Sequence, residues 1–312
     1  MNFKKPNFWD LPKPNIISYL LIPFSLPIIM RNFFSQFFKR KKSPKIKTIC
    51  VGNIYVGGTG KTPLTIKLYE ILKKFNNKIA TVKKDYPNQR DEQILLKKKT
   101  SLIISKSRSS AIKEGINENF KILIFDDGLQ DLKVDYDLKF ACFKSKNWIG
   151  NGLCIPAGPM REKISSLKRF DAVFLNGNSN NFENIYDQIK NTNPNILIFK
   201  TLYKILNIDK YDLNLKYLIF SGIGNPIDFK NILLENKFNV AKEITFPDHF
   251  NYGYKDIEKI IEIAKKGNFK VITTEKDYMK IPDKFKKDIE YLSIDLLIKN
   301  EDELISLLKK FL

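Results

Sequence analysis

The sequence predicts an α/β protein built on a parallel sheet with helices on both of its faces. Apolar runs typical of buried strands alternate along the chain with segments of helical periodicity. A glycine-rich turn joins the first of these runs to a helix, and a later run leads directly into two aspartates. The expected fold is therefore P-loop NTPase-like, with a smaller C-terminal α/β domain and an N-terminal membrane-associated helical segment.

Eight apolar runs are expected to form strands, and amphipathic spacing predicts helices between several of them. The runs cover residues 46–51, 79–82, 121–125, 138–143, 172–175, 196–199, 217–220 and 270–274. Apolar residues at helical spacing follow the glycine-rich turn, recur over 257–264 and recur again near the C-terminus. The alternation weakens around 200–215. We therefore expect an N-terminal segment over 1–44, a nucleotide-binding domain over 45–205 and a C-terminal domain over 206–312.

Composition bounds the partners and the compartment. The chain has 312 residues, enough for two domains of ordinary size, and 43% of them are hydrophobic. Its formal net charge of +20 favours anionic partners such as nucleotides or phospholipid headgroups. Lysine supplies most of this charge, because only six arginines are present. Three cysteines without paired or metal-type spacing indicate a reducing compartment.

The glycine-rich turn has the features of a phosphate-binding loop. Its residues are Gly57, Gly58, Thr59, Gly60, Lys61 and Thr62. Backbone N–H groups of such a turn point at phosphate oxygens, the lysine offsets their charge, and the threonine hydroxyl can bind Mg²⁺. The usual pattern has another glycine where this chain has Tyr55. A turn with an incidental Gly-Lys-Thr is the alternative, and the strand and helix on either side favour a nucleoside triphosphate site.

Asp126 and Asp127 follow the apolar run 121–125 directly. In a parallel sheet this places two carboxylates at the carboxyl end of a strand, where they can hold the Mg²⁺ of a bound ATP. An Asp-Asp-Gly turn on the surface is the alternative reading.

Three further residues are candidates for catalysis. His249, the single histidine, lies in a Phe-Pro-Asp-His loop beside an acid, which suits a general base or a structural residue about equally. Arg161 lies in the proline-rich segment 156–162 and is a candidate phosphate clamp. Asp91 is a weaker candidate, because an exposed charged turn explains it equally well.

The N-terminal segment combines apolar and basic residues. Residues 1–47 carry ten basic side chains and one acidic one, and residues 16–30 are uncharged. That apolar run contains two prolines and is short for a membrane span of about 20 residues. It is followed by Phe33, Phe34, Phe37, Phe38, Lys39, Arg40, Lys41 and Lys42. This pattern is typical of an interfacial segment on an anionic leaflet, and a helical hairpin packed on the core is the alternative.

The ordered motifs resemble those of the tetraacyldisaccharide 4'-kinase family, the lipid A 4'-kinases of Gram-negative bacteria. The likeness runs nearly end to end and includes the family's own phosphate loop, which also lacks the glycine at position 55. The matching segments are Phe8-Trp9, 51–63, 126–130, 150–152, 156–162, 221–226, 246–249 and 274–277.

The resemblance implies transfer of the γ-phosphoryl group of ATP to the 4'-hydroxyl of an acylated glucosamine disaccharide 1-phosphate. It implies a location at the cytoplasmic face of the inner membrane, where the protein is peripheral or anchored by the N-terminal segment. The membrane surface there is anionic and is an expected partner. It also implies that Asp91 and His249 together activate the sugar hydroxyl, and that Asp126 and Asp127 bind Mg²⁺. No nucleic acid partner is expected.

Three departures from the family pattern stand out. Residues 83–87 read Lys-Lys-Asp-Tyr-Pro where the family has Ser-Arg-Gly-Tyr-Gly, so its arginine is lost or replaced by Lys84. The segment before Asp91 is shortened and altered. Asp131 stands where the family has a histidine.

A membrane-recruited P-loop NTPase switch that acts on a protein partner is the alternative function. It shares the phosphate loop, the aspartates and the basic N-terminal segment, but it does not need His249 or the 156–162 loop. A nucleic-acid NTPase rests on net charge alone and is the weakest reading.

Overall fold

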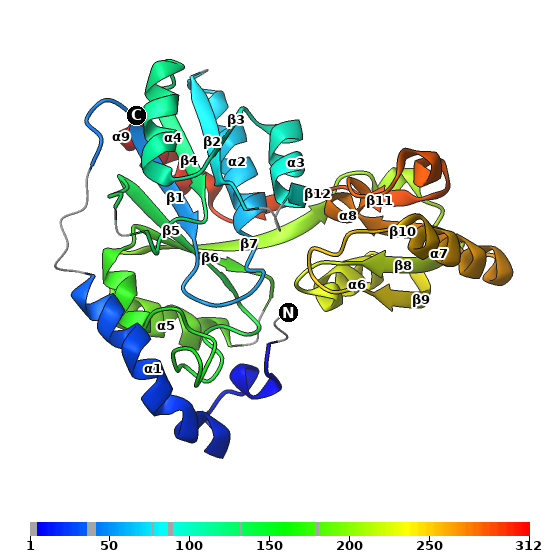
Figure 1. Ribbon diagram of the computed structural model, residues 1–312, viewed down its shortest axis with the longest axis horizontal. Coiled ribbons are helices and arrows are strands. Elements are labelled where there is room, and N and C mark those ends of the chain that lie inside the picture. Colours follow the sequence, from blue (N-terminus) through cyan, green and yellow to red (C-terminus); the bar gives the residue numbers. More distant parts are fainter. Residues whose placement is uncertain (1–4, 36–41, 77, 87–89, 132, 179–180) are drawn as a thin grey trace. The chain divides into compact units, whose positions relative to one another are not determined.

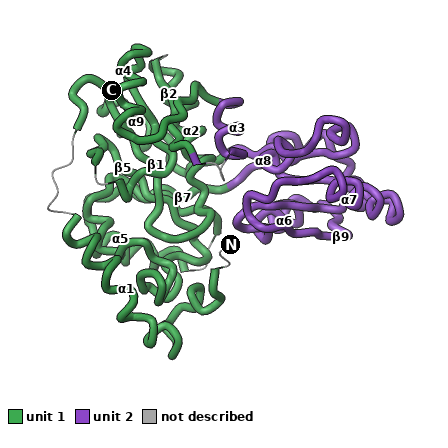
Figure 2. Tube along the Cα trace, viewed as in Figure 1, with its two compact units in different colours: residues 1–85, 100–202, 296–312 green, residues 86–99, 203–295 purple. Residues whose placement is uncertain are grey.

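The chain folds into two compact units. The computed structural model describes residues 5–35, 42–76, 78–86, 90–131, 133–178 and 181–312. Unit 1 consists of Met1–Asp85, Thr100–Leu202 and Leu296–Leu312, and unit 2 consists of Tyr86–Lys99 and Tyr203–Asp295 (Figures 1 and 2). The domain limits expected from the sequence remain a prediction.

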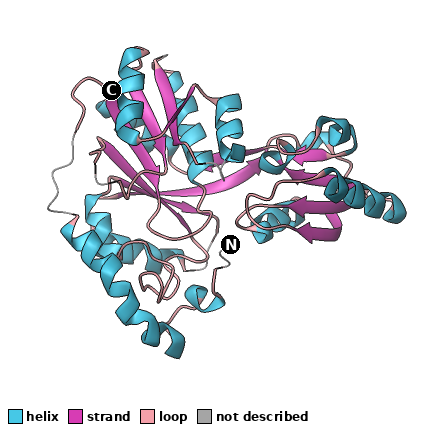
Figure 3. Cartoon of the chain, viewed as in Figure 1, coloured by secondary structure: helices cyan, strands magenta, loops and turns pink. Residues whose placement is uncertain are grey.

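Unit 1 is organised around an eight-stranded sheet of order β12-β7-β6-β5-β1-β4-β2-β3. Strands are magenta and helices cyan in Figure 3. Its strands are β1 (Lys47–Gly52), β2 (Ile79–Lys84), β3 (Leu102–Ser105), β4 (Ile122–Asp126), β5 (Leu138–Lys144), β6 (Ala172–Asn176), β7 (Leu197–Ile205) and β12 (Ile294–Ile298). The pairings that join β7 through to β3 are all parallel. The carboxyl ends of these strands therefore share one edge of the sheet, where α/β proteins bind their ligands.

Both faces of this sheet are buried, as expected for parallel strands. The consecutive residues Ile49, Cys50 and Val51 of β1 are each 0% exposed, although neighbouring side chains point to opposite faces. The helices of unit 1 are α1 (Ile16–Phe34), α2 (Lys61–Lys73), α4 (Arg108–Asn117), α5 (Phe182–Thr192) and α9 (Glu301–Phe311), with 3-10 turns at Asn7–Asp10 and Ile164–Arg169.

Helix α1 is longer than its composition suggests. It runs without interruption from Ile16 to Phe34 through Pro23 and Pro27, which the sequence reading treated as interruptions. Asn15 caps its first turn by accepting a hydrogen bond from the Ser18 N–H at 2.9 Å. Of the segment expected to follow on the same face, Phe37, Phe38, Lys39, Arg40 and Lys41 lie outside the described residues.

Unit 2 contains a four-stranded sheet of order β11-β10-β8-β9, in which all pairings are parallel. Its strands are β8 (Lys216–Ser221), β9 (Asn239–Thr245), β10 (Lys270–Thr274) and β11 (Glu290–Leu292), and its helices are α3 (Arg90–Lys99), α6 (Pro226–Glu235), α7 (Tyr254–Gly267) and α8 (Glu275–Tyr278), with 3-10 turns at Ile208–Lys210 and Asp283–Asp288. One core cluster gathers around Leu218, Phe220 and Ile257, and a second around Tyr217, Ile219 and Leu233.

All eight apolar runs form strands, and the helices expected after the glycine-rich turn, over 257–264 and at the C-terminus are α2, α7 and α9. Four strands were not expected from the sequence: β3, β9, β11 and β12. Each is an edge strand in its sheet, so one side of the strand has no neighbour and the apolar pattern is short or broken by charge.

Candidate active site

The glycine-rich turn connects the end of β1 to the start of α2 in unit 1. Helix α2 begins at Lys61, so its free N–H groups face the turn. Gly57 and Gly60 have φ values of 128° and 91°, a region that side-chain-bearing residues rarely adopt. A Cβ added to Gly58 would meet nothing within 4 Å, so the loop is open at that point. This is the local geometry of an anion-binding turn.

Two buried side chains hold the turn in shape. The Asn53 amide, 0% exposed, donates to the Gly57 carbonyl at 3.2 Å and to the Thr59 hydroxyl at 3.1 Å. Tyr55 occupies the position of the usual extra glycine and is buried, with its hydroxyl donating to Asp10 and accepting from Lys5. Burial and the Asp10 carboxylate both raise the pKa of Tyr55, so the phenol stays protonated. Where the usual pattern has a glycine, this chain therefore has a tyrosine that contacts the N-terminal segment.

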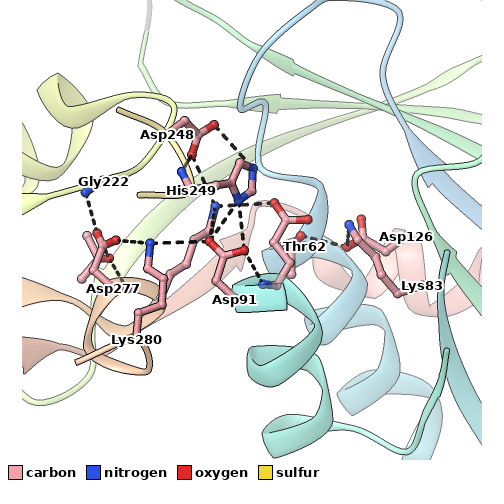
Figure 4. A network of polar contacts seen from close by, with 12 residues as sticks. Thr62, Lys83, Asp91, Asp126, Gly222, Asp248, His249, Asp277 and Lys280 are labelled. Carbon is pink, nitrogen blue, oxygen red and sulfur yellow. Dashed lines mark hydrogen bonds and ion pairs between the residues drawn. The ribbon is translucent and has the colours of Figure 1, made fainter. Parts of the chain in front are cut away.

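Asp126 is the last residue of β4 and accepts a hydrogen bond from the first turn of α2. The Thr62 hydroxyl donates to its Oδ2 at 2.9 Å, and the Lys83 ammonium on β2 donates to the same oxygen at 2.9 Å (Figure 4). The side chains of Lys83 and Asp126 are 3% and 0% exposed. The Asp126 Oδ1 is buried and has no hydrogen-bond partner among the described residues. This carboxylate can therefore accept a further cationic ligand beside the phosphate loop.

Asp127 lies next to two cationic side chains. Its Oδ2 is 3.7 Å from the Lys61 Nζ and 3.5 Å from the Arg161 Nη1. Burial opposes ionisation of Asp127, but the charges of Lys61 and Arg161 outweigh it and lower the pKa of the carboxyl. Asp127 adopts φ 65°, an uncommon value for a residue other than glycine. The structure thus brings the phosphate-loop lysine, the arginine of the 156–162 segment and the second aspartate together.

Asp131, which departs from the family pattern, pairs with an arginine. Its Oδ2 is 3.1 Å from the Arg108 Nη1 at the start of α4. The Arg108 guanidinium also donates to the Asp127 carbonyl, from Nε at 3.2 Å and from Nη2. Asp131 therefore fixes an arginine that holds the backbone of Asp127.

Asp91 and His249 meet in unit 2. Asp91 is in the first turn of α3, and its side chain is 3% exposed. His249 follows β9 with φ 61°, and its backbone N–H donates to the Gly222 carbonyl at 3.1 Å. The His249 Nδ1 is 3.0 Å from each carboxylate oxygen of Asp91 (Figure 4). The reading of Asp91 as an exposed charged turn is therefore wrong, because this carboxylate is buried against the ring.

Two lysines complete the surroundings of Asp91. Thr274 caps α8, which carries Lys276, and Lys280 follows the helix. The Lys276 Nζ is 3.2 Å and the Lys280 Nζ 3.7 Å from the Asp91 Oδ2. Burial alone would raise the pKa of Asp91, but the His249 hydrogen bond and the Lys276 charge hold it well below its usual range. Lys280 is fixed in turn by Asp277, whose Oδ1 is 2.7 Å from its Nζ.

This arrangement fixes which nitrogen of His249 is basic. An ionised carboxylate only accepts hydrogen bonds, so the Nδ1 facing Asp91 carries the proton of the neutral ring. The Nε2 then has a free lone pair, and it makes no hydrogen bond within the described part of the chain. The Asp248 Oδ2 lies 3.7 Å from it. The pair has the geometry of a general base and the group that orients it.

The sequence-predicted residues fall into two clusters. In unit 1 the phosphate loop, Asp126, Asp127 and Arg161 lie together, and in unit 2 Asp91 lies against His249. Sequence reasoning did not single out Lys83, Asn53 or Lys276 for these contacts. Lys83 carried no clear signal in the sequence, because it stands at the end of its strand beside a second lysine, Lys84, where an exposed lysine would be expected.

A strand, a glycine turn, a helix N-terminus with Lys61 and Thr62, and a strand-end aspartate define a phosphoryl-transfer protein of the P-loop class. The sequence pattern of the tetraacyldisaccharide-1-P 4'-kinase family matches residues 17–312. This chain belongs to that family.

Individual relatives agree with this assignment. A tetraacyldisaccharide 4'-kinase of Pelagibacter ubique (strain HTCC1062) is 48% identical over 312 residues, which cover 99% of this chain and 98% of the relative. One from Rickettsia akari (strain Hartford) is 34% identical and covers 95% of this chain and 94% of its own. Among solved structures, LpxK from Aquifex aeolicus in complex with ATP matches with a TM-score of 0.70 at 24% identity, over 95% of this chain and 99% of that one. This last likeness confirms the fold expected from the sequence.

Proposed function

We propose that this chain transfers the γ-phosphoryl group of ATP to the 4'-hydroxyl of a tetraacylated glucosamine disaccharide 1-phosphate, with His249 as the base. Family membership makes it a tetraacyldisaccharide 4'-kinase of lipid A biosynthesis. The roles of the individual residues in this reaction are what we propose. The observation that carries them is the contact of the His249 Nδ1 with both oxygens of Asp91, at 3.0 Å each.

ATP is the phosphoryl donor in this proposal. The Aquifex aeolicus relative was solved in complex with ATP, and the same fold here carries an open phosphate loop. Backbone N–H groups from Gly57 to Thr62 would cradle the phosphates, and Lys61 would offset the charge of the transferred group. Arg161 would add a second cation there, since its guanidinium lies 3.5 Å from the Asp127 carboxylate beside the loop.

The residues present fit a magnesium ion. Thr62 and Asp126 are already hydrogen bonded, and the unpartnered Asp126 Oδ1 provides an oxygen that such an ion would use. Asp127 supplies a second carboxylate. Phosphate oxygens and water would supply the remaining ligands of the ion. When bound, Mg²⁺ would neutralise charge on the β- and γ-phosphates.

The sugar hydroxyl needs a proton acceptor, and His249 meets this need. Its Nε2 would take the hydroxyl proton, while Asp91 holds the ring in the required tautomer and stabilises the charged ring that results. Lys276 keeps Asp91 ionised and therefore able to do this. His249→Gln and Asp91→Asn would each remove proton transfer without removing the phosphate loop.

The acyl chains of the substrate place the reaction at a membrane. Helix α1 is long and apolar enough to cross a bilayer, with a mean hydropathy of 1.5, and 11% of that segment is buried in the protein. Exposed apolar side chains such as Leu20 and Phe24, 70% and 67% exposed, would enter the acyl region of the leaflet. We place the enzyme at the cytoplasmic face of the inner membrane, held by this helix.

The test uses purified enzyme, ATP and the lipid disaccharide in mixed micelles. His249→Gln should lower kcat about 10²- to 10⁴-fold, the usual contribution of a general base, while ATP binding is unchanged. Asp248→Asn, a matched change beside the ring, should retain more of the activity. A wild-type kcat in His249→Gln would remove this residue from the mechanism.

A further inference from the structure

Helix α1 carries a polar stripe within its apolar sequence. Ser18, Ser25 and Asn32 are spaced seven residues apart, so they fall on one face of a helix with 3.6 residues per turn. Ser18 and Ser25 are 0% and 2% exposed, whereas most of the large apolar side chains of α1 are exposed. The helix therefore turns its polar face to the protein, the reverse of an ordinary surface helix.

All three stripe residues bond to one segment, residues 151–161. The Asn151 amide donates to the Ser18 hydroxyl at 3.0 Å, and the Ser25 hydroxyl donates to the Cys154 carbonyl at 2.8 Å. The Asn32 amide donates to the Arg161 carbonyl at 2.7 Å. In Figure 1, α1 is the blue helix that lies beside the green part of the chain to which this segment belongs.

The same segment also forms hydrogen bonds with the residues that lead into the phosphate loop. The Arg161 N–H donates to the Ile54 carbonyl at 2.7 Å, and the Val56 N–H donates to the Pro159 carbonyl at 2.9 Å. The Arg161 guanidinium is 3.3 Å from the Gln130 Oε1 and 3.5 Å from the Asp127 Oδ2. One residue, Arg161, is therefore held by α1 at its carbonyl and, at its N–H, by the segment that leads into the phosphate loop.

We propose that the polar stripe makes α1 a positioning element for Arg161, with Asn32 as the residue that acts most directly. The inference rests on the proposed role of Arg161 as a charge partner of the transferred phosphoryl group. Polar side chains weaken membrane insertion, so anchoring alone does not explain three of them in register on one face. The hydrogen bonds of Ser18, Ser25 and Asn32 instead connect the membrane-binding helix to the segment that carries Arg161, the arginine proposed to bind the transferred phosphoryl group.

The expected effect is on turnover. Without the Asn32 amide, the Arg161 carbonyl loses its hydrogen bond to α1. The guanidinium keeps its contacts with Gln130 and Asp127, but the backbone that carries it is less firmly fixed. Asn32→Ala should lower kcat roughly two- to twelvefold, the rate equivalent of one lost hydrogen bond, because misplacement of a charge partner is felt in the transition state. The KM for the lipid should change less than kcat.

A double-mutant cycle tests this inference in detergent-dispersed full-length enzyme. The variants are Asn32→Ala, Arg161→Ala and their combination, with Asn184→Ala on the exposed surface of α5 as the matched control. If Asn32 acts through Arg161, the combination should lose less than twofold beyond Arg161→Ala alone. Asn184→Ala should behave as wild type. Ser25→Ala provides a second stripe variant that should show the same dependence on Arg161.

Each outcome has a distinct meaning. A wild-type kcat in both Asn32→Ala and Ser25→Ala overturns the positioning role. So does a full Asn32 effect that persists without the Arg161 guanidinium, since it would reflect loss of structure. A wild-type kcat in Arg161→Ala contradicts the role of that arginine and the inference built on it, while transfer to the lipid itself would still stand.

Discussion

Replacing Lys83 by methionine should destabilise unit 1 and make its stability depend on magnesium. The Lys83 Nζ lies 2.9 Å from the Asp126 Oδ2, and the two side chains are 3% and 0% exposed. Methionine fills a similar volume but carries no charge. The Asp126 carboxylate would then keep only the Thr62 hydroxyl as a hydrogen-bond partner among the described side chains.

The size of the effect follows from burial. Breaking a buried ion pair by removing one partner costs about 3–5 kcal/mol, because the other charge stays buried without compensation. For a domain of this size class, each kcal/mol lowers the midpoint of thermal unfolding by about 2–4 °C. We therefore expect the midpoint to fall by roughly 6–20 °C in the absence of ligands.

Thermal unfolding with and without ligands makes the prediction specific. Because Mg²⁺ would neutralise Asp126, ATP with magnesium should stabilise Lys83→Met more than it stabilises the wild type, and ATP with a chelator should not. Lys121→Met, at an exposed lysine just before β4, is the matched control and should unfold like the wild type. Equal midpoints for Lys83→Met and wild type, or equal shifts on adding magnesium and ATP, would refute the reasoning.

Three other changes test the remaining parts of the site. His249→Gln and Asp91→Asn should each reduce kcat about 10²- to 10⁴-fold, and the double variant should lose little more, since the two side chains act as a unit; additive losses in steady-state assays would contradict this. The pKa of Asp91 is lowered below its ordinary value of 3.8, so its ionisation stabilises unit 2 at neutral pH, and this stability is lost as pH falls through the folded-state pKa. Urea unfolding should therefore find Asp91→Asn less stable than wild type at pH 7, with a smaller difference in unfolding free energy near pH 3. The same difference at both pH values would argue against an ionised Asp91 carboxylate in the folded protein. Gly60→Ala, at φ 91°, should cost about 1–2 kcal/mol and weaken ATP binding, as titration of a fluorescent nucleotide would measure, and unchanged binding would mean that the turn does not need this conformation.

The central strands and the phosphate loop were predictable because local patterns determine them. Buried parallel strands read as continuous apolar runs, and the loop is a contiguous motif that needs no partner from elsewhere in the chain. Asp126 and Asp127 could be placed beside the loop because carboxyl ends of parallel strands share an edge. The family resemblance was confirmed by the comparisons.

The contacts between distant residues could not be predicted in this way. Asp91 has a neighbourhood that reads as a charged surface, and its burial depends on lysines that follow it by more than 180 positions in the sequence. The edge strand β9 mixes charged and apolar residues, because one of its sides pairs with no other strand of the sheet. The polar stripe of α1 was hidden because its residues are each isolated among apolar neighbours, and only the helical repeat brings them into line.

The most direct test of the account follows the γ-phosphate of ATP. Enzyme, magnesium, γ-labelled ATP and the acylated disaccharide 1-phosphate are incubated together, and the label is located by extraction and by chemical analysis of the lipid. The account predicts that the label enters the lipid fraction as a phosphate on the 4'-oxygen, and that little free phosphate forms without the lipid. Label that appears only as free phosphate, whether or not the lipid is present, would contradict it and would favour the nucleotide switch.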